Sequence, residues 1–187
     1  MELVLASRNA HKALEFEGLI TGASVLPLPA GVELPPETGN TFAENALVKA
    51  QTAASATGRP AIADDSGIAA GALGGAPGVR SARFAGENAT DEENLALLRA
   101  RVPPGSPLAY HCAIAFCGPD EEFVVEARCT GTMATEPRGD GGFGYDPVFV
   151  CDDDPDGRTM AELSSAEKAA ISHRGRAARL LGERLAR

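Results

Sequence analysis

The sequence has no long apolar run, and none of its hydrophobic segments approaches the roughly 20 residues that a helix needs to span a bilayer. Its first residues, MELVLASRN, also lack the basic region and the long apolar core of a secretion signal. We therefore expect no membrane partner and a cytoplasmic location.

Cysteine is scarce and never occurs as a CxxC pair. The four cysteines, Cys112, Cys117, Cys129 and Cys151, lie mostly in apolar, strand-like segments. Zinc sites need short paired spacings, and cytosolic thiols stay reduced. We expect all four to be reduced side chains that contribute only to packing.

Positive charge is also in short supply: 17 lysines and arginines face 26 aspartates and glutamates, which gives a net charge of −9. Coating a nucleic acid requires a basic surface, so we expect no nucleic-acid partner. A phosphate-bearing ligand would need a metal ion or a local basic pocket. Residues 164–187, with six basic and two acidic side chains, could form that pocket or could simply complement the dipole of a helix end.

What is present is a folded chain. Of its 187 residues, 44% are hydrophobic and 23% are charged, enough to bury a core. The length fits one domain, and no linker or repeat divides it, so we predict a single domain over residues 1–187.

The first half alternates strand and helix patterns. The Thr41 and Glu44 pair has the spacing of a capping box, and Gly58 should end the helix that this pair begins. The expected elements are a strand over 1–6, a helix over 7–20, a proline-rich connection over 26–40, a helix over 41–57 and a strand over 61–63 that ends in an acidic turn.

The second half contains glycine-rich loops and a hairpin pattern. Ser172 is expected to cap the last helix, with Leu180, Leu181 and Leu185 facing the core. The other expected elements are an irregular loop over 67–86, a helix over 91–101 capped by Thr90 and Glu93, a β-hairpin over 107–131, a loop over 137–150 that leads into a strand at 148–150, and a short helix capped by Ser164 and Glu167. Together they predict an α/β fold with a mixed sheet.

The two adjacent aspartates in AIADDSG are the first candidates for chemistry. Asp64 and Asp65 at a strand end would repel each other unless cations or hydrogen bonds compensate. Mg²⁺ would be a natural compensator, and a solvated turn is the alternative. Glu37 has no evident structural task and is the better second metal ligand, because Glu44 already fits a capping box.

The first strand–helix turn is a second candidate. Ser7, Asn9 and Lys12 lie where free backbone N–H groups and a lysine favour an anion, although they could equally be helix caps and a solvated side chain. In GGFGYDP, Phe143 and Tyr145 could stack on a planar base or simply fill space under a loop. Lys168, His173 and Arg174 carry donors suited to phosphate or to a purine carbonyl.

Six motifs, in order and at similar intervals, resemble those of the inosine triphosphate pyrophosphatase family: SRNAHK, PETGNTFAENALVKA, ADDSG, LGGAPGVRSARFAG, PRGDGGFGYDPVF and EKAAISHRGRA. The resemblance implies an elongated single domain with a central mixed sheet flanked by helices and a long substrate cleft. It also implies a Mg²⁺-dependent homodimer that hydrolyses dITP, ITP and XTP to the monophosphate and pyrophosphate, and so removes deaminated purines from the nucleotide pool.

The resemblance also assigns roles to individual residues. Asp65 would be the general base and, with Glu37, a Mg²⁺ ligand, while Asp64 and Glu44 would shape the metal surroundings. The implied substrate-binding residues are Ser7, Arg8, Asn9, Ala10, His11, Lys12, Ser66, Phe143, Gly144, Tyr145, Asp146, Lys168, His173 and Arg174. Among them, Phe143 would stack on the base, and His173 with Arg174 would read its 6-keto oxygen.

Two other interpretations remain open. A nucleotide-binding module would hold a triphosphate without cutting it and would need no base beside the metal. A phosphatase with an aspartyl intermediate would release orthophosphate instead of pyrophosphate.

Overall fold

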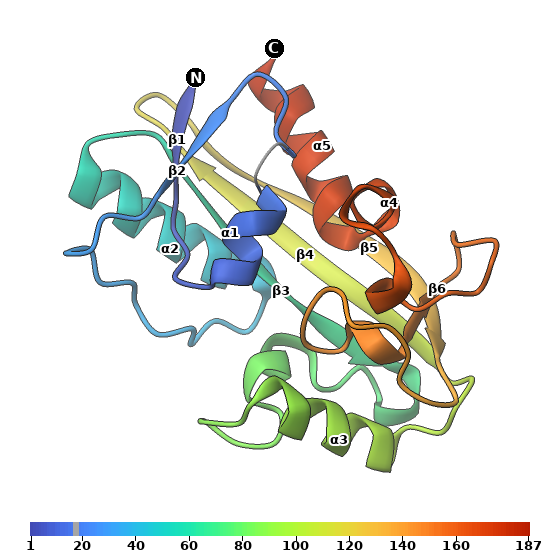
Figure 1. Ribbon diagram of the computed structural model, residues 1–187. Coiled ribbons are helices and arrows are strands. Elements are labelled where there is room, and N and C mark those ends of the chain that lie inside the picture. The colour runs from blue at the N-terminus through green and yellow to red at the C-terminus, as the bar shows by residue number, and fades with distance from the viewer. Residues whose placement is uncertain (17–18) are drawn as a thin grey trace. The chain divides into compact units, whose positions relative to one another are not determined.

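The computed structural model describes residues 1–16 and 19–187, and its strands form a mixed sheet in the order β2-β1-β3-β4-β5-β6 (Figure 1). Pairing is parallel between β1 and both β2 and β3, and antiparallel between β5 and β6, which confirms the predicted α/β class with a mixed sheet. The strands are β1 Glu2–Leu5, β2 Ser24–Pro27, β3 Ala61–Ala70, β4 Pro107–Cys117, β5 Glu122–Met133 and β6 Phe149–Cys151.

The helices lie between and after these strands. The α-helices are α1 Ala10–Phe16, α2 Phe42–Thr57, α3 Asp91–Arg101, α4 Ser165–Ile171 and α5 His173–Leu185. Four short 3₁₀ helices are η1 Gly71–Leu73, η2 Gly78–Arg83, η3 Asp146–Val148 and η4 Met160–Glu162.

The chain forms two compact units. Unit 1 comprises Met1–Asp65, Cys112–Ala127 and Arg174–Arg187, and unit 2 comprises Ser66–His111 and Arg128–His173. The boundaries fall within β3, β4 and β5 and, at the C-terminal end, after His173, the first residue of α5.

In unit 1, successive strand residues pack on opposite faces of the sheet, as the two-residue period of a strand requires. Leu3 and Ile62 pack with α1 and α5, whereas Val4 and Ala63 pack with α2. Figure 1 shows α2 and α5 on different sides of these strands. The helix residues in these contacts are Phe16, Ala177, Ala178 and Leu181 on one face, and Ala46, Ala50 and Ala53 on the other.

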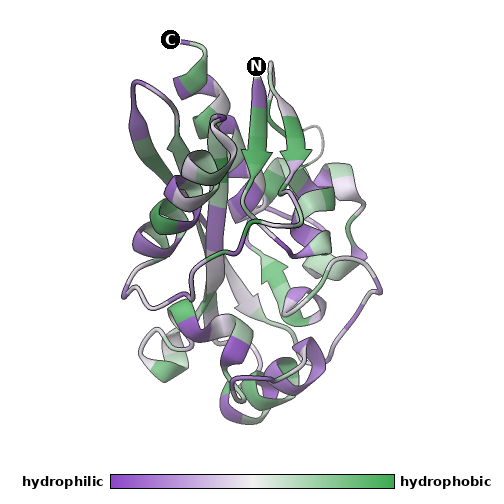
Figure 2. Ribbon diagram, turned by 90° about the vertical axis from the view of Figure 1, so that its left-hand side faces the viewer, coloured by the Kyte–Doolittle hydropathy of each residue, from purple (hydrophilic) through white to green (hydrophobic). Residues whose placement is uncertain are grey.

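The colouring in Figure 2 follows this packing: β1 and β2 are mostly hydrophobic, whereas the helices alternate hydrophobic and polar residues. Unit 2 has its own core, in which Leu98 of α3 packs with Ile68, Tyr110, Phe149 and Met160. Each unit therefore buries its own hydrophobic cluster.

The predicted helix ends are largely confirmed. Thr41 accepts a hydrogen bond from the Glu44 N–H at 3.1 Å, and Gly58, with φ 65°, ends α2. The carboxylate of Glu44 accepts from the Asn40 N–H at 2.7 Å. Complete capping boxes begin α3 and α4, at Thr90 with Glu93 and at Ser164 with Glu167.

Several predicted boundaries are wrong. β3 extends to Ala70, so Asp64 and Asp65 lie inside a strand and not in a turn after it. The expected irregular loop over 67–86 begins as strand and contains η1 and η2. β2 was not predicted; it overlaps the first two residues of the connection expected over 26–40, pairs along its whole length with β1, and ends at Pro27.

At the two ends of the chain, other details differ. The helix predicted over 7–20 is observed as Ala10–Phe16, and residues 17–18 of that prediction lie outside the described residues. Ser172 is the C-terminal cap of α4 and also directly precedes His173, the first residue of α5, so its capping of the last helix stays a prediction. Leu181 is buried, but Leu180 is 42% exposed and does not face the core.

The four cysteines are free thiols, and all but Cys117 are buried, as predicted. In the described part of the chain, none of the helices has the length and apolar character needed to cross a membrane.

Candidate functional site

Asp64 and Asp65 are neighbours on β3, and their side chains point to opposite faces of the sheet. Both residues are almost completely buried, at 1% and 4% exposure. Ile62 and Ala63, just before them, alternate between the two packed faces, and the aspartates continue this alternation. Each carboxylate therefore meets a different set of partners.

Asp64 is surrounded by cations. Its Oδ2 lies 3.0 Å from Lys12 Nζ and 3.0 Å from Arg174 Nη2. Burial by itself would raise the pKa of Asp64, but the charges of Lys12, Arg174 and Lys49 outweigh it and hold that pKa well below its usual value. Asp64 is a permanently charged anchor for basic side chains.

Arg174 is the largest fully buried side chain among the described residues. Its guanidinium donates to Asp64 from Nε and Nη2, at 3.3 and 3.0 Å, and also to Glu15. A buried guanidinium needs such carboxylate partners to offset its lost hydration. In this structure Arg174 therefore belongs to the Asp64 cluster.

Asp65 has a different environment. Its Oδ2 accepts a hydrogen bond from Asn45 Nδ2 at 2.8 Å, and Lys49 Nζ lies 3.9 Å from its Oδ1. Burial and the nearby Glu37 carboxylate raise the pKa of Asp65 despite the opposing charge of Lys49. Two adjacent carboxylates are thus pushed in opposite directions, the arrangement that separates a general base from a structural anion.

Lys49 connects the carboxylates of this region. Its Nζ lies 2.6 Å from Glu37 Oε1 and donates to the Asp64 carbonyl oxygen at 2.7 Å. The charges of Asp64, Glu37 and Asp65 raise the pKa of Lys49 although burial opposes them, so it is a charged ammonium. Glu37 and Asp65 therefore converge on one positive charge.

Asn45 and Lys49 were missed by the sequence reasoning. They lie one helical turn apart on α2, on the same face as the buried alanines Ala46, Ala50 and Ala53. Polar residues at core spacing in an alanine-rich helix were the signal that could have identified them. The cluster formed by Lys12, Glu37, Asn45, Lys49, Asp64, Asp65 and Arg174 is called the acidic cluster below.

The predicted phosphate-binding turn forms the start of α1. Asn9 Oδ1 accepts from the Lys12 N–H at 3.1 Å, and Ser7 Oγ accepts from the Asn9 N–H at 3.2 Å. The Arg8 guanidinium donates to four carbonyl oxygens of the following connection, those of Leu28, Pro29, Ala30 and Val32. The Arg8 side chain therefore holds the connection, while Ala10 and His11 are exposed.

Unit 2 holds a separate polar group centred on Asp146, at the start of η3. Asp146 is 3% exposed. Its Oδ2 accepts from Lys168 Nζ at 2.6 Å and from the Phe143 N–H at 2.9 Å, and its Oδ1 accepts from the Tyr110 hydroxyl at 3.1 Å. Both carboxylate oxygens are thereby hydrogen-bonded.

The aromatic side chains of this loop have distinct environments. Phe143 is half-buried, and Lys168 Nζ lies 5.2 Å from the centre of its ring. Tyr145 is buried, and its hydroxyl donates to the Ser81 carbonyl at 2.7 Å. The Gly144 N–H donates to Asp91 at 3.0 Å. Phe143 is therefore the more accessible of the two aromatic rings.

Gly142 is required by this geometry. It has a φ of 70°, and a Cβ there would collide with the Asp146 carboxylate. A glycine at this position therefore lets the loop backbone fold against Asp146.

His173, the first residue of α5, stacks on Tyr110 with ring centres 4.5 Å apart and planes 9° apart. Tyr110, which the sequence reasoning also missed, thus contacts both His173 and Asp146. The group formed by Tyr110, Phe143, Asp146, Lys168 and His173 is called the Asp146 network below. Ser66, which follows Asp65 on β3, is partly exposed.

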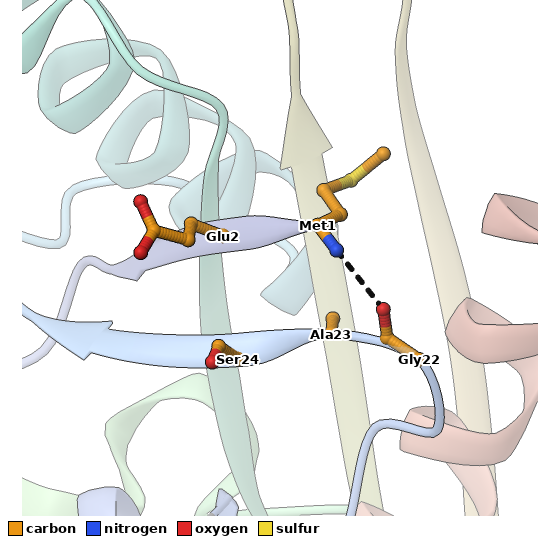
Figure 3. Close-up of a pocket in the computed structure, with 5 residues that line it drawn as sticks. All are labelled: Met1, Glu2, Gly22, Ala23 and Ser24. Atoms are coloured by element: carbon orange, nitrogen blue, oxygen red, sulfur yellow. Dashed lines mark hydrogen bonds between the residues drawn. The ribbon is translucent and has the colours of Figure 1, made fainter.

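A surface hollow of about 440 Å³ lies at the start of β1 and beside β2 (Figure 3). It is lined by Met1, Glu2, Gly22, Ala23 and Ser24, and the Met1 amine donates to the Gly22 carbonyl at 3.1 Å. None of the predicted site residues lines this hollow, so it is not the candidate site.

Buried carboxylates set among lysine and arginine side chains combine a candidate proton acceptor with positive charge that can stabilise an anion, as a hydrolase of charged substrates requires. The chain belongs to the Ham1 family, whose model matches residues 3–184.

Individual relatives agree with this assignment. The chain is 47% identical to a dITP/XTP pyrophosphatase of Geobacillus kaustophilus over 97% of this chain and 93% of the relative. It is 46% identical to a dITP/XTP pyrophosphatase of Shigella flexneri over 96% and 95%. A solved structure of a HAM1 protein from Coxiella burnetii matches with a TM-score of 0.86 and 42% identity, over 100% of this chain and 98% of that one.

Proposed function

We propose that this protein hydrolyses deaminated purine nucleoside triphosphates, namely dITP, ITP and XTP, to the nucleoside monophosphate and pyrophosphate. The observation that carries the proposal is the geometry of the acidic cluster, in which Glu37 and Asp65 converge on Lys49 beside the pairing of Asp64 with Lys12 and Arg174. The names of the relatives support the choice of substrate and of product.

Asp65 would act as the general base. Water adds to phosphorus at the bridge between the α- and β-phosphates while the bridging P–O bond breaks, and a proton of the water passes to Asp65. The 2.8 Å hydrogen bond from Asn45 Nδ2 to Oδ2 would hold the Asp65 carboxylate in position to accept this proton. Pyrophosphate leaves with the electron pair of the broken bond between the α-phosphorus and the bridging oxygen.

The acidic cluster also suits a triphosphate. Lys12 is half-buried beside Asp64 and would contact the phosphate chain, together with Ser7, Arg8, Asn9, Ala10 and His11 of the first turn. Because Lys12 and Arg174 form ion pairs with Asp64, their charged groups are held in place before substrate binds.

The residues also fit a Mg²⁺ ion. Within residues 1–16 and 19–187, no group of three or more His, Cys, Asp or Glu side chains forms a metal cage. Glu37 and Asp65, however, converge on one positive charge, that of Lys49, and their oxygens are the donors that Mg²⁺ prefers. Mg²⁺ characteristically takes one or two protein carboxylates and completes its shell with water and substrate phosphates. When bound, it would neutralise charge on the phosphates, and Glu37 and Asp65 would hold it.

The Asp146 network would bind the base. Phe143 would stack on the purine, with Gly144 and Tyr145 shaping the loop and Ser66 touching the substrate. Lys168 and His173 would donate to the 6-keto oxygen, whereas Arg174, bonded to Asp64 and Glu15, would serve the acidic cluster. Adenine carries an amino donor at that position, which leaves opposed donors unpaired, a large penalty once they are buried.

We further propose that the chain acts as one domain, as a homodimer, and in the cytoplasm. The net charge of −9 supports the expectation of no nucleic-acid partner, because coating a nucleic acid requires a basic surface.

A panel of purified nucleoside triphosphates with Mg²⁺ tests the function. We expect pyrophosphate from ITP, dITP and XTP and little from ATP. Release of orthophosphate would favour the phosphatase alternative, and tight ITP binding without any product would favour a binding module. Either result would refute the proposal.

A further inference from the structure

We propose that Tyr110 is a positioning residue that sets base selectivity, by fixing Asp146 through its hydroxyl and supporting His173 with its ring. The inference rests on the proposed function of the Asp146 network in base binding. Tyr110 would not itself contact the base; it would act through the two residues that it touches.

The contacts of Asp146 give the first argument. Lys168 Nζ and the Phe143 N–H both donate to Oδ2, at 2.6 and 2.9 Å, and the Tyr110 hydroxyl donates to Oδ1 at 3.1 Å. A carboxylate held from both oxygens cannot rotate without breaking a hydrogen bond. The Tyr110 hydroxyl therefore fixes the direction in which Asp146 holds the ammonium of Lys168 and the backbone of Phe143.

The Tyr110 ring gives the second argument. It lies parallel to the His173 imidazole at 4.5 Å and packs at a tilt against Phe149, also at 4.5 Å. His173 is 4% exposed, and Tyr110 is 6% exposed. One side chain thus supports a base-reading imidazole and orients a base-reading lysine.

The Tyr110 hydroxyl also occupies Oδ1 of Asp146 as a hydrogen-bond acceptor. Asp146 is the acidic member of a network that would present donors to a keto oxygen. Without the Tyr110 hydroxyl, Oδ1 loses a donor and becomes able to accept from an amino group. We therefore expect loss of the hydroxyl to weaken inosine recognition and to narrow the preference for hypoxanthine over adenine.

The test compares Tyr110→Phe, which keeps the ring, with Tyr110→Leu, which removes it. Titration calorimetry with inosine monophosphate and adenosine monophosphate measures binding independently of catalysis, and ITP kinetics give kcat and KM. Tyr110→Phe should weaken inosine monophosphate binding and raise the KM for ITP by roughly 10-fold, because Asp146 would no longer hold Lys168 in place and a hydrogen bond from a charged donor to the ligand is worth at least that factor. Its kcat should stay within about twofold, and Tyr110→Leu should lose more affinity still.

Thr159→Val is the matched control. It also removes a buried hydroxyl in unit 2, one that donates to the Arg138 carbonyl at 2.7 Å and lies outside the Asp146 network. The control should lose stability without changing the ratio of the two monophosphate affinities.

Unchanged affinity and selectivity in Tyr110→Phe would overturn the inference, as would an equal loss of selectivity in Thr159→Val. In both cases a wild-type protein that cleaves ITP leaves the proposed function standing. A wild-type protein that neither cleaves ITP nor binds inosine monophosphate would overturn both.

Discussion

The pKa values of Asp64 and Asp65 shift in opposite directions because adjacent strand residues face different layers of helices. Asp64 meets Lys12 of α1 and Arg174 of α5, whereas Asp65 meets Asn45 and Lys49 of α2. The two adjacent aspartates therefore have separate environments, one on each face of the sheet. One collects basic side chains, and the other keeps a raised pKa suited to accepting a proton.

The Asp64 pairings should stabilise the fold. Asp64→Asn leaves the buried Arg174 with only part of its counter-charge, which should cost about 3 kcal/mol, or roughly 6 to 12 °C in Tm. Thermal unfolding measures the change. Glu2→Gln, at an exposed pair with Arg59, is the control and should cost less than about 1 kcal/mol.

The pH dependence of this loss has a defined sign. The folded pKa of Asp64 is lowered, so its contribution is complete above the unfolded value of about 3.9 and is lost as the pH falls towards the folded pKa. The difference in the free energy of unfolding between wild type and Asp64→Asn should therefore be constant from pH 5 to 7, a range that lies above the unfolded pKa of about 3.9. It should shrink as the pH falls below that pKa. A gap that widened on acidification would contradict the pairing.

At the residue scale, the sequence pointed to charges that had no local explanation, and their roles in the site stay predictions. The unexplained pair Asp64 and Asp65 and the free-standing Glu37 all lie in the acidic cluster. Lys49 and Tyr110 were missed because their importance comes from partners distant in sequence: Tyr110 meets Asp146, 36 positions away. For Tyr110 no local pattern carries that information, whereas the spacing of Lys49 among the buried alanines of α2 was a usable signal.

At the scale of elements, helix starts were the most predictable features because their hydrogen bonds are local. Thr41, Thr90 and Ser164 each accept from the N–H three residues later, as their sequence spacing predicts. The extent of β3 was not predictable in the same way. Its glycine and acidic residues argue against a strand, and only sheet pairing and cations from other elements make it favourable.

The capping box of α3 can be tested by itself. Thr90→Ala removes the acceptor for the Glu93 N–H, which lies 3.2 Å away, and should cost about 1 kcal/mol of the free energy of unfolding. Thr90→Ser keeps the hydroxyl and should restore most of it. Denaturant unfolding of the two variants measures the difference, and equal losses would show that the hydroxyl is not the stabilising group.

At the scale of the whole molecule, fold class was predictable and the compact units were not. The strand and helix patterns indicated a mixed α/β sheet, and the sheet contains both parallel and antiparallel pairs. The division into two units depends on contacts between segments far apart in sequence, such as Met1–Asp65 with Arg174–Arg187.

The proposed homodimer is testable by light scattering. One chain has a mass of 19.2 kDa, so two give 2 × 19.2 = 38.4 kDa. We expect the larger mass at micromolar protein concentration and at moderate salt. A mass of one chain across that range would contradict the dimer without affecting the chemistry assigned to the acidic cluster.

The central claim is that Asp65 accepts the proton of the attacking water, and Asp65→Asn tests it most directly. Asparagine keeps the size and the hydrogen bond partner Asn45 but removes the base, so ITP turnover should fall by at least ~100-fold while ITP binding persists. Asp120→Asn, an exposed aspartate in the β4–β5 turn, should behave as wild type. Asp65→Asn turnover equal to that of wild type would contradict the account.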